Sequence, residues 1–155
     1  MFNGELGLGG GYTGKSLPFF KNFFAGGNNS VRGYDLNSLG PRDPIQPVDP
    51  ANPDDPNRNT RTVALGGNKR VVGNLEILFP MPFMRDDRSL RLSTFIDGGS
   101  VFAGKIDLND MRYSAGIAVS WISPMGPLKI SLAKPLNDKP EDNLQILQFQ
   151  FGQRF

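Results

Sequence analysis

The chain has 155 residues, with 17 basic and 15 acidic side chains, a formal net charge of +2, and neither cysteine nor histidine. These counts exclude disulfides, thiol or imidazole metal ligands and nucleophile–histidine triads, and the balanced charge does not indicate nucleic-acid binding. With 19 glycines, 13 prolines and no run of roughly 20 apolar residues, the sequence predicts few helices and no membrane-spanning helix.

The first part of the chain contains one weak strand pattern followed by a long turn-rich segment. From Phe2 to Tyr12, leucines alternate with glycines and polar residues, as in a glycine-softened strand. From about residue 13 to about residue 62, the sequence is rich in Gly, Asn, Pro and Asp and has no strand pattern. Because loops of this length are uncommon in compact domains, we expect the segment to be functional or disordered.

Five later segments alternate apolar and polar residues with the period of two that is typical of β-strands. They cover residues 70–79, 90–97, 112–121, 128–133 and 146–155, and the Gly98–Gly99 pair is expected to end the second of them. The connections between them are rich in turn residues and too short for crossover helices. Together with the first segment, they predict an all-β fold, an antiparallel meander of six strands.

One face of this predicted sheet is apolar and the other is polar. The polar face carries Arg70, Glu76, Arg91, Asp97, Arg112, Gln148, Gln150 and Arg154. Such a face suits the lumen of a membrane barrel, but a soluble sheet with one solvated face shows the same alternation. The alternation alone therefore leaves a soluble β-protein and a membrane barrel both open.

The last predicted strand, about residues 144–155, favours the membrane barrel. It places Leu147, Phe149, Phe151 and Phe155 on one face. In water these side chains would make an aggregation-prone edge, whereas in lipid they form an ordinary outward face with an interfacial aromatic residue. The segment resembles the C-terminal targeting strand of outer-membrane barrels, which ends in an aromatic residue.

The long loop contains the segment 23–34, which ends in Val31, Arg32, Gly33 and Tyr34. This segment resembles the Val-Arg-Gly-aromatic loop motif of the BamA/TamA superfamily of outer-membrane barrels. Residues 74–80, 95–99, 123–128 and 133–135 also resemble the superfamily. The resemblance implies that the loop of residues 13–62 enters the lumen of a transmembrane β-barrel.

The same resemblance implies that Arg32 contacts acidic side chains on the lumen wall, and Glu76 and Asp97 are the expected partners. Physical chemistry supports this pairing, because an arginine that loses its hydration in a confined lumen needs partner charge and hydrogen bonds. The planar guanidinium can hold one or two carboxylates at once. Gly33 permits close approach or a positive φ beside the arginine.

For the whole chain, the resemblance implies a BamA-like role. Residues 1–155 are expected to be the C-terminal part of an outer-membrane β-barrel domain whose other strands and periplasmic domains are missing from this sequence. The implied function is non-enzymatic: assembly and insertion of β-barrel proteins into the bacterial outer membrane. The terminal strand would form half of a seam at which client strands pair by β-augmentation.

The expected partners follow from that role. They are outer-membrane lipid, client outer-membrane proteins and, through the missing N-terminal part, accessory assembly lipoproteins. We expect no nucleic acid, cofactor or metal, and we expect the isolated fragment to form a homo-oligomer, because six strands leave two open edges.

Several alternatives remain. A TamA-like barrel or a two-partner secretion translocator shares the arginine loop, although residues 19–24 and the terminal Phe155 favour a BamA-like factor. A soluble ligand-binding β-barrel would instead place its apolar residues inward. Glu76 and Asp97 could form a glycosidase pair, but Arg32 explains them better. The acidic residues of the long loop lack the spacing of an EF-hand, which makes a solvated loop the simpler explanation.

Overall fold

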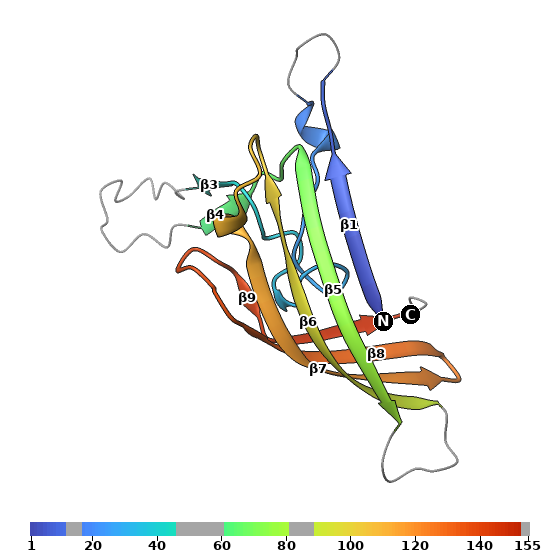
Figure 1. The fold of residues 1–155 in the computed structure, drawn as a ribbon. Helices are drawn as coiled ribbons and strands as arrows, with labels where there is room; N and C mark the ends of the chain where they lie inside the picture. The colour runs from blue at the N-terminus through green and yellow to red at the C-terminus, as the bar shows by residue number, and fades with distance from the viewer. Residues whose placement is uncertain (12–16, 46–60, 81–88, 153–155) are drawn as a thin grey trace, which may run out of the picture.

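The main feature of the computed structural model, which describes residues 1–11, 17–45, 61–80 and 89–152, is a six-stranded antiparallel sheet. The strand order is β1-β5-β6-β7-β8-β10, and the strands turn progressively from β1 to β10 (Figure 1). They are β1 (Phe2–Leu8), β5 (Lys69–Pro80), β6 (Leu90–Phe102), β7 (Arg112–Ser123), β8 (Gly126–Pro135) and β10 (Leu147–Phe151). The predicted six-stranded meander is confirmed.

Shorter elements lie in the connections. They are the 3-10 turns η2 (Phe19–Lys21) and η3 (Leu108–Asp110), the pair β2 (Gly33–Tyr34) and β9 (Leu144–Gln145), and the pair β3 (Arg42–Ile45) and β4 (Arg61–Ala64). The long connection therefore contains strands, contrary to its sequence pattern, because two to four residues are too few to show alternation. Within the described ranges, no helix is long and apolar enough to cross a membrane.

The two faces of the sheet differ in polarity. Many large apolar side chains of one face are exposed, among them Leu75, Ile77, Ile96, Ile117, Trp121, Leu132, Leu147, Phe149 and Phe151. The polar side chains Ser93, Asp97, Ser114, Ser131 and Gln148 are buried on the opposite face. This is the inverse of a soluble β-barrel, whose apolar residues point inward, and it is the arrangement of a membrane barrel.

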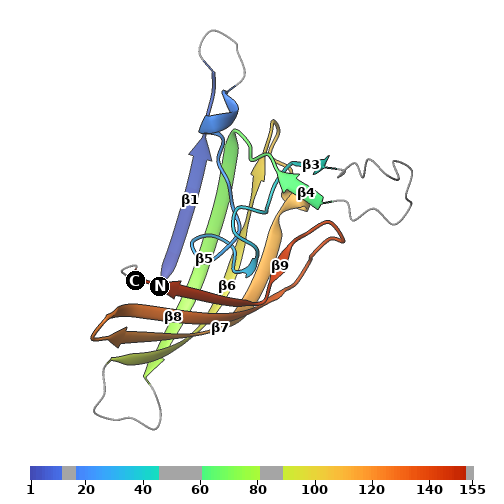
Figure 2. The ribbon, with the colours of Figure 1, turned by 180° about the vertical axis from the view of Figure 1, so that it is seen from behind.

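The polar face is covered by part of the long connection, residues 22–40, which we call the inner loop. It lies across β5 and β6 in Figure 2. The largest buried apolar cluster joins Ala25, Val31, Tyr34 and Leu39 of the loop to Val72 of β5 and Val101 of β6. The core of the described structure therefore lies between the loop and the sheet.

Strand β6 continues through the Gly98–Gly99 pair, where the sequence predicted a break. A Cβ on Gly98 would lie 2.8 Å from the ring of Tyr113. A Cβ on Gly99 would lie 2.6 Å from the carbonyl oxygen of Val71 and 3.1 Å from the side chain of Val31. The prediction of a break was wrong because these glycines permit close packing against the inner loop and β7 instead of a turn.

The final strand changes partners within its length. β9 pairs with β2 of the inner loop, whereas β10 pairs with β8. Between them, the carbonyl of Ile146 accepts a hydrogen bond from Ala133 N–H at 2.9 Å. The strand predicted for residues 144–155 is therefore divided at Ile146, because the inner loop takes up the backbone of residues 144–145. Phe155 lies outside the described residues.

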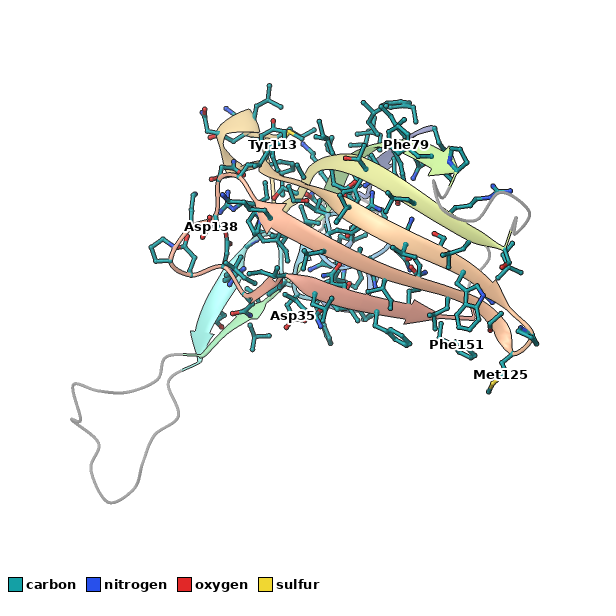
Figure 3. All side chains as sticks on the ribbon, turned by 90° about the horizontal axis from the view of Figure 1, so that it is seen from below. Asp35, Phe79, Tyr113, Met125, Asp138 and Phe151 are labelled. Atoms are coloured by element: carbon teal, nitrogen blue, oxygen red, sulfur yellow. The ribbon has the colours of Figure 1, made fainter. Side chains whose placement is uncertain are left out.

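Figure 3 shows the two ends of the sheet. Met125 and Phe151 lie near one end, and Tyr113 and Asp138 lie near the other. The first end carries the tight β7–β8 turn, in which Ser123 Oγ donates to the carbonyl of Gly126 at 2.6 Å. The second end carries the longer β6–β7 and β8–β9 connections.

Candidate functional site at the inner loop

Glycines set the path of the inner loop on both sides of Arg32. Gly26 and Gly27 have φ values of +110° and +90°, which L-residues rarely adopt, and they begin a turn closed by Ser30. In that turn Ser30 Oγ accepts from Gly26 N–H at 2.7 Å. Gly33 has φ +90°, and a Cβ there would lie 3.1 Å from Cβ of Ala133 in β8. These turns bring the loop close to β8 and direct Arg32 toward β6.

Arg32 binds two carboxylates of the sheet. Its Nε and Nη2 donate to the two oxygens of Asp97 at 2.6 and 2.8 Å, and its Nη1 donates to Glu76 at 3.0 Å. The backbone N–H of Arg32 also donates to Asp97, at 3.1 Å. The guanidinium carbon lies 3.4 Å from the centroid of the Phe95 ring, a cation–π contact. The structure thus brings together the arginine and both carboxylates singled out in the sequence.

The contact is nearly dry. The side chains of Arg32 and Asp97 are 5% and 0% exposed, and that of Glu76 is 14% exposed. Burial by itself would lower the pKa of Arg32, but the hydrogen bonds and negative charges of Asp97 and Glu76 outweigh it and raise the pKa above its ordinary value. Arg32 therefore contacts the two carboxylates as a charged guanidinium.

Lys129 of β8 balances the charge of this site. Its Nζ donates to both oxygens of Glu76, at 2.9 and 3.0 Å. Ser93 donates to Glu76 at 2.7 Å, and Asn74 donates to Asp97 at 2.9 Å. All four carboxylate oxygens therefore have donors, and two cations face two anions. We call Arg32, Glu76, Asp97 and Lys129 the Arg32 site.

Sequence reasoning did not assign Lys129, Asn74, Ser93 or Phe95 to this site. The alternation placed each of them on the face of Glu76 and Asp97, and that was the available signal. It did not show that Lys129 reaches Glu76, because two strands separate β8 from β5 in the sheet order. Only the curvature of the sheet brings these side chains together.

Val31 and Tyr34, the apolar members of the loop motif, fill the space between the loop and the sheet, and both are 0% exposed. The Tyr34 hydroxyl donates to the carbonyl of Tyr113 at 3.3 Å. The Tyr34 carbonyl accepts from Nε2 of Gln148 at 2.7 Å. Burial, with a contribution from the nearby negative charge of Asp142, raises the pKa of Tyr34 to about 12.

The terminal strand presents different residues to its two sides. Leu147, Phe149 and Phe151 lie on the outer face and are more than half exposed, away from the Arg32 site. The backbone and the inward-facing side-chain amides of the terminal strand contact the inner loop instead. Asn28 Nδ2 donates to the carbonyl of Phe149 at 3.1 Å, and Gln150 Nε2 donates to Asn29 Oδ1 at 3.2 Å. The inner loop therefore joins the β5–β6 part of the sheet to the terminal strand.

This arrangement is suited to holding a segment in place. Both carboxylates are saturated with donors, so neither is poised to accept a proton from a substrate or to act as a nucleophile. Across the described ranges, no group of three His, Cys, Asp or Glu residues could hold a metal ion. The site fixes the position of the inner loop by charge, hydrogen bonding and packing.

Comparison with known proteins supports a membrane-barrel interpretation. The chain is 40% identical, over its whole length, to 21% of the outer membrane protein assembly factor BamA of Neisseria meningitidis serogroup B. It is 28% identical, over 88% of its length, to 15% of the outer membrane protein assembly factor BamA of Nitratidesulfovibrio vulgaris. It therefore spans about a fifth or less of the length of these relatives.

Among solved structures, the crystal structure of BamA from Haemophilus ducreyi lacking POTRA domains 1–3 matches 96% of the chain. The TM-score is 0.78, the sequence identity is 31%, and the match covers 30% of that chain. The described sheet thus has the fold of part of that barrel protein. Residues 1–155 match the Omp85 superfamily domain, and the chain belongs to the Omp85 superfamily.

Proposed function

We propose that this chain is part of a non-enzymatic factor that assembles and inserts β-barrel proteins into the bacterial outer membrane. The single observation that carries the proposal is the 40% identity, along the whole chain, to a protein named as an outer membrane protein assembly factor. The exposed apolar face and the buried polar face support a location in the outer membrane.

In this proposal, residues 1–155 are the C-terminal part of a larger barrel domain. Two features support it: the chain covers 30% of the matched barrel structure, and β1 and β10 each have only one neighbour in the sheet. The end with the tight β7–β8 turn would face the periplasm, where turns are short. The end with η3 and the β8–β9 connection would face outside.

The inner loop has a structural role in the proposed function. Docked by Val31, Arg32, Gly33 and Tyr34, it would hold the barrel wall and the terminal strand in one arrangement. The outward residues Leu147, Phe149 and Phe151 would face lipid beside a seam. Client strands would then add at the free edge of β10, whose outer neighbour is missing from the described sheet.

The proposed partners are outer-membrane lipid, client outer-membrane proteins and accessory assembly lipoproteins. Lipid contact is supported by the exposed outer face. Client proteins are supported by the relatives, which are named as outer membrane protein assembly factors. The lipoproteins would bind through domains outside this chain.

We also propose that the isolated chain self-associates in detergent. A sheet with two open edges exposes backbone N–H and C=O groups that neither lipid nor detergent can satisfy, and a second copy can. Light scattering of the detergent-solubilised chain should show a dimer or larger oligomer. A monodisperse monomer without detergent would contradict both the membrane location and the self-association.

The function is tested with the complete barrel protein reconstituted into liposomes. Denatured outer-membrane barrel clients should insert faster into these liposomes than into lipid alone. Arg32→Ala should slow insertion, because the loop would no longer be fixed. Arg91→Ala is the matched control, because Arg91 is an exposed arginine near the start of β6. The Arg91→Ala protein should insert clients at the normal rate. Insertion no faster than into lipid alone would reject the proposed function.

A further inference from the structure

A second charged cluster lies away from the Arg32 site. The carboxylate of Asp142, whose side chain is 3% exposed, accepts from Arg112 Nε at 2.6 Å and from Arg42 Nη2 at 3.2 Å. Both arginine side chains are 9% exposed. The same carboxylate also accepts from the backbone N–H of Lys139 at 2.8 Å. We call Asp142, Arg42 and Arg112 the Asp142 clamp.

The clamp joins three separate parts of the chain. Arg42 begins β3, directly after the inner loop; Arg112 begins β7; and Asp142 lies just before β9. The arginines also bind backbone in these parts: Arg42 Nη2 donates to the carbonyl of Ser38 at 2.6 Å, and Arg112 Nη1 donates to that of Asp110 at 3.2 Å. Arg42 further donates to the carbonyl of Glu141.

Asp142 is the centre of the clamp because its carboxylate accepts hydrogen bonds from both guanidiniums. Two nearly buried guanidiniums that share one carboxylate repel each other when that carboxylate is removed. An asparagine in its place would keep the size of the side chain and lose the charge. The loss would release the end of the inner loop, the start of β7 and the β8–β9 connection together.

The residues that follow Asp142 are bonded to the inner loop. Asp35 N–H donates to the carbonyl of Asn143 at 2.9 Å, and Gly33 and Tyr34 pair with Gln145 and Leu144. The chain joins β8 only at Ile146, where the terminal strand proper begins. The entry to the terminal strand is therefore positioned by the loop, and the clamp fixes the loop to that entry.

We propose that Asp142 is a positioning residue that couples docking of the inner loop to the position of the terminal strand. This inference rests on the proposed function, in which the terminal strand borders the seam. Undocking of Arg32 at the wall would be transmitted through the clamp to the residues that lead into β10. A client strand that displaces the terminal strand would, by the same coupling, loosen the loop.

The test uses backbone amide exchange, resolved to single residues, in the complete barrel protein in detergent. Two amides report on the two ends: Arg32 N–H, bonded to Asp97, and Ala133 N–H, bonded to the Ile146 carbonyl. Asp142→Asn should speed exchange at both by about tenfold or more, the effect expected when a charged hydrogen-bond centre is lost. Asp138→Asn, the same change at an exposed site in the same connection, should alter neither.

The coupling itself is tested by a double-mutant cycle. Arg32→Ala should speed exchange at Ala133 in the native background, and it should add less than about threefold in the Asp142→Asn background. Multiplication of the two separate effects would overturn the proposal, as would an Asp142→Asn effect at Ala133 that does not reach Arg32. Asp142→Glu, which keeps the charge, should restore most of the protection.

A variant that keeps one ion pair of the clamp tests the same proposal if Asp142→Asn does not fold. Arg42→Gln leaves the Asp142–Arg112 pair intact, and it should speed exchange at both reporters by a smaller factor; no change at either would overturn the proposal. The amide-exchange measurement does not depend on client insertion, so the two experiments can fail separately. Coupled exchange without insertion activity would reject only the proposed function, and insertion without coupled exchange would reject only this inference.

Discussion

The inner loop is held by two ion clusters that differ in which charge lies at the centre: a cation in one and an anion in the other. At the Arg32 site one loop cation contacts two wall carboxylates, and Lys129 brings the charge to balance. At the Asp142 clamp one carboxylate lies between two arginines. The residue that cannot be removed without leaving like charges face to face is therefore Arg32 in the first cluster and Asp142 in the second.

The largest expected effect is at the centre of the Arg32 site. Arg32→Ala would leave Asp97 buried without its cation, and the docked loop should lose about 3 to 5 kcal/mol. Arg32→Lys should recover little, because an ammonium cannot reproduce the fork that binds both oxygens of Asp97. Limited proteolysis of the complete barrel should show faster cleavage in the inner loop for both variants. Full protection in Arg32→Lys would show that charge alone holds the loop.

The two carboxylates of the Arg32 site should differ. Asp97 is fully buried and binds three nitrogens of Arg32, whereas Glu76 is partly exposed, binds only a fourth nitrogen, Nη1, and keeps Lys129. Asp97→Asn should therefore destabilise docking by about 2 to 3 kcal/mol and Glu76→Gln by about 1 kcal/mol. Chemical denaturation of the complete barrel, followed at the inner loop, measures both. The opposite order would contradict the assignment of Asp97 as the main partner.

Ionisation of Tyr34 should make docking of the inner loop depend on pH. Its pKa is raised to about 12 in the folded state, so the unfolded chain ionises first as pH rises. The stability contributed by the neutral hydroxyl is present below about pH 10 and is lost between about pH 10 and 12. Loop docking should weaken over this range more in the native chain than in Tyr34→Phe. Parallel pH profiles for the two proteins would show that Tyr34 does not report on docking.

The smallest effect should come from the exposed Lys139–Asp110 pair near the clamp. Lys139 lowers the pKa of Asp110 by a hydrogen bond of 2.9 Å and by its charge, but both side chains are about half exposed. Lys139→Ala should therefore change stability by less than about 0.5 kcal/mol. The contribution is present above the ordinary aspartate pKa and is lost as pH falls through the lowered value. A change above about 1 kcal/mol would mean that the pair belongs to the clamp.

The two clusters also differ in how far sequence could predict them. The Arg32 contact could be anticipated because the alternation set the faces of Glu76 and Asp97, and the loop motif supplied the cation. The clamp could not, because Arg42 and Asp142 lie outside the predicted strands, where alternation carries no information, although the alternation placed Arg112 on the polar face. Its partners lie 30 and 100 positions from Asp142, and only the docked loop brings them together.

The same reasoning explains the remaining differences between sequence and structure. The close packing at Gly99 and the bend at Ile146 depend on contacts with the inner loop, and the sequence pattern did not predict the path of that loop. Strand order and faces are properties of local alternation and short connections, and these were predictable. Features created by the docked loop were not.

The pairing of β1 with β5 has a consequence for the order of folding. Phe2 lies opposite Leu75, so this pair closes a far longer stretch of chain than the neighbouring hairpins of β5 to β8. Closing long stretches costs more entropy and is slow. We expect the four strands from β5 to β8 to form first. The inner loop would then settle on a surface that already exists, and β1 would add last, after the arginine has found its carboxylates.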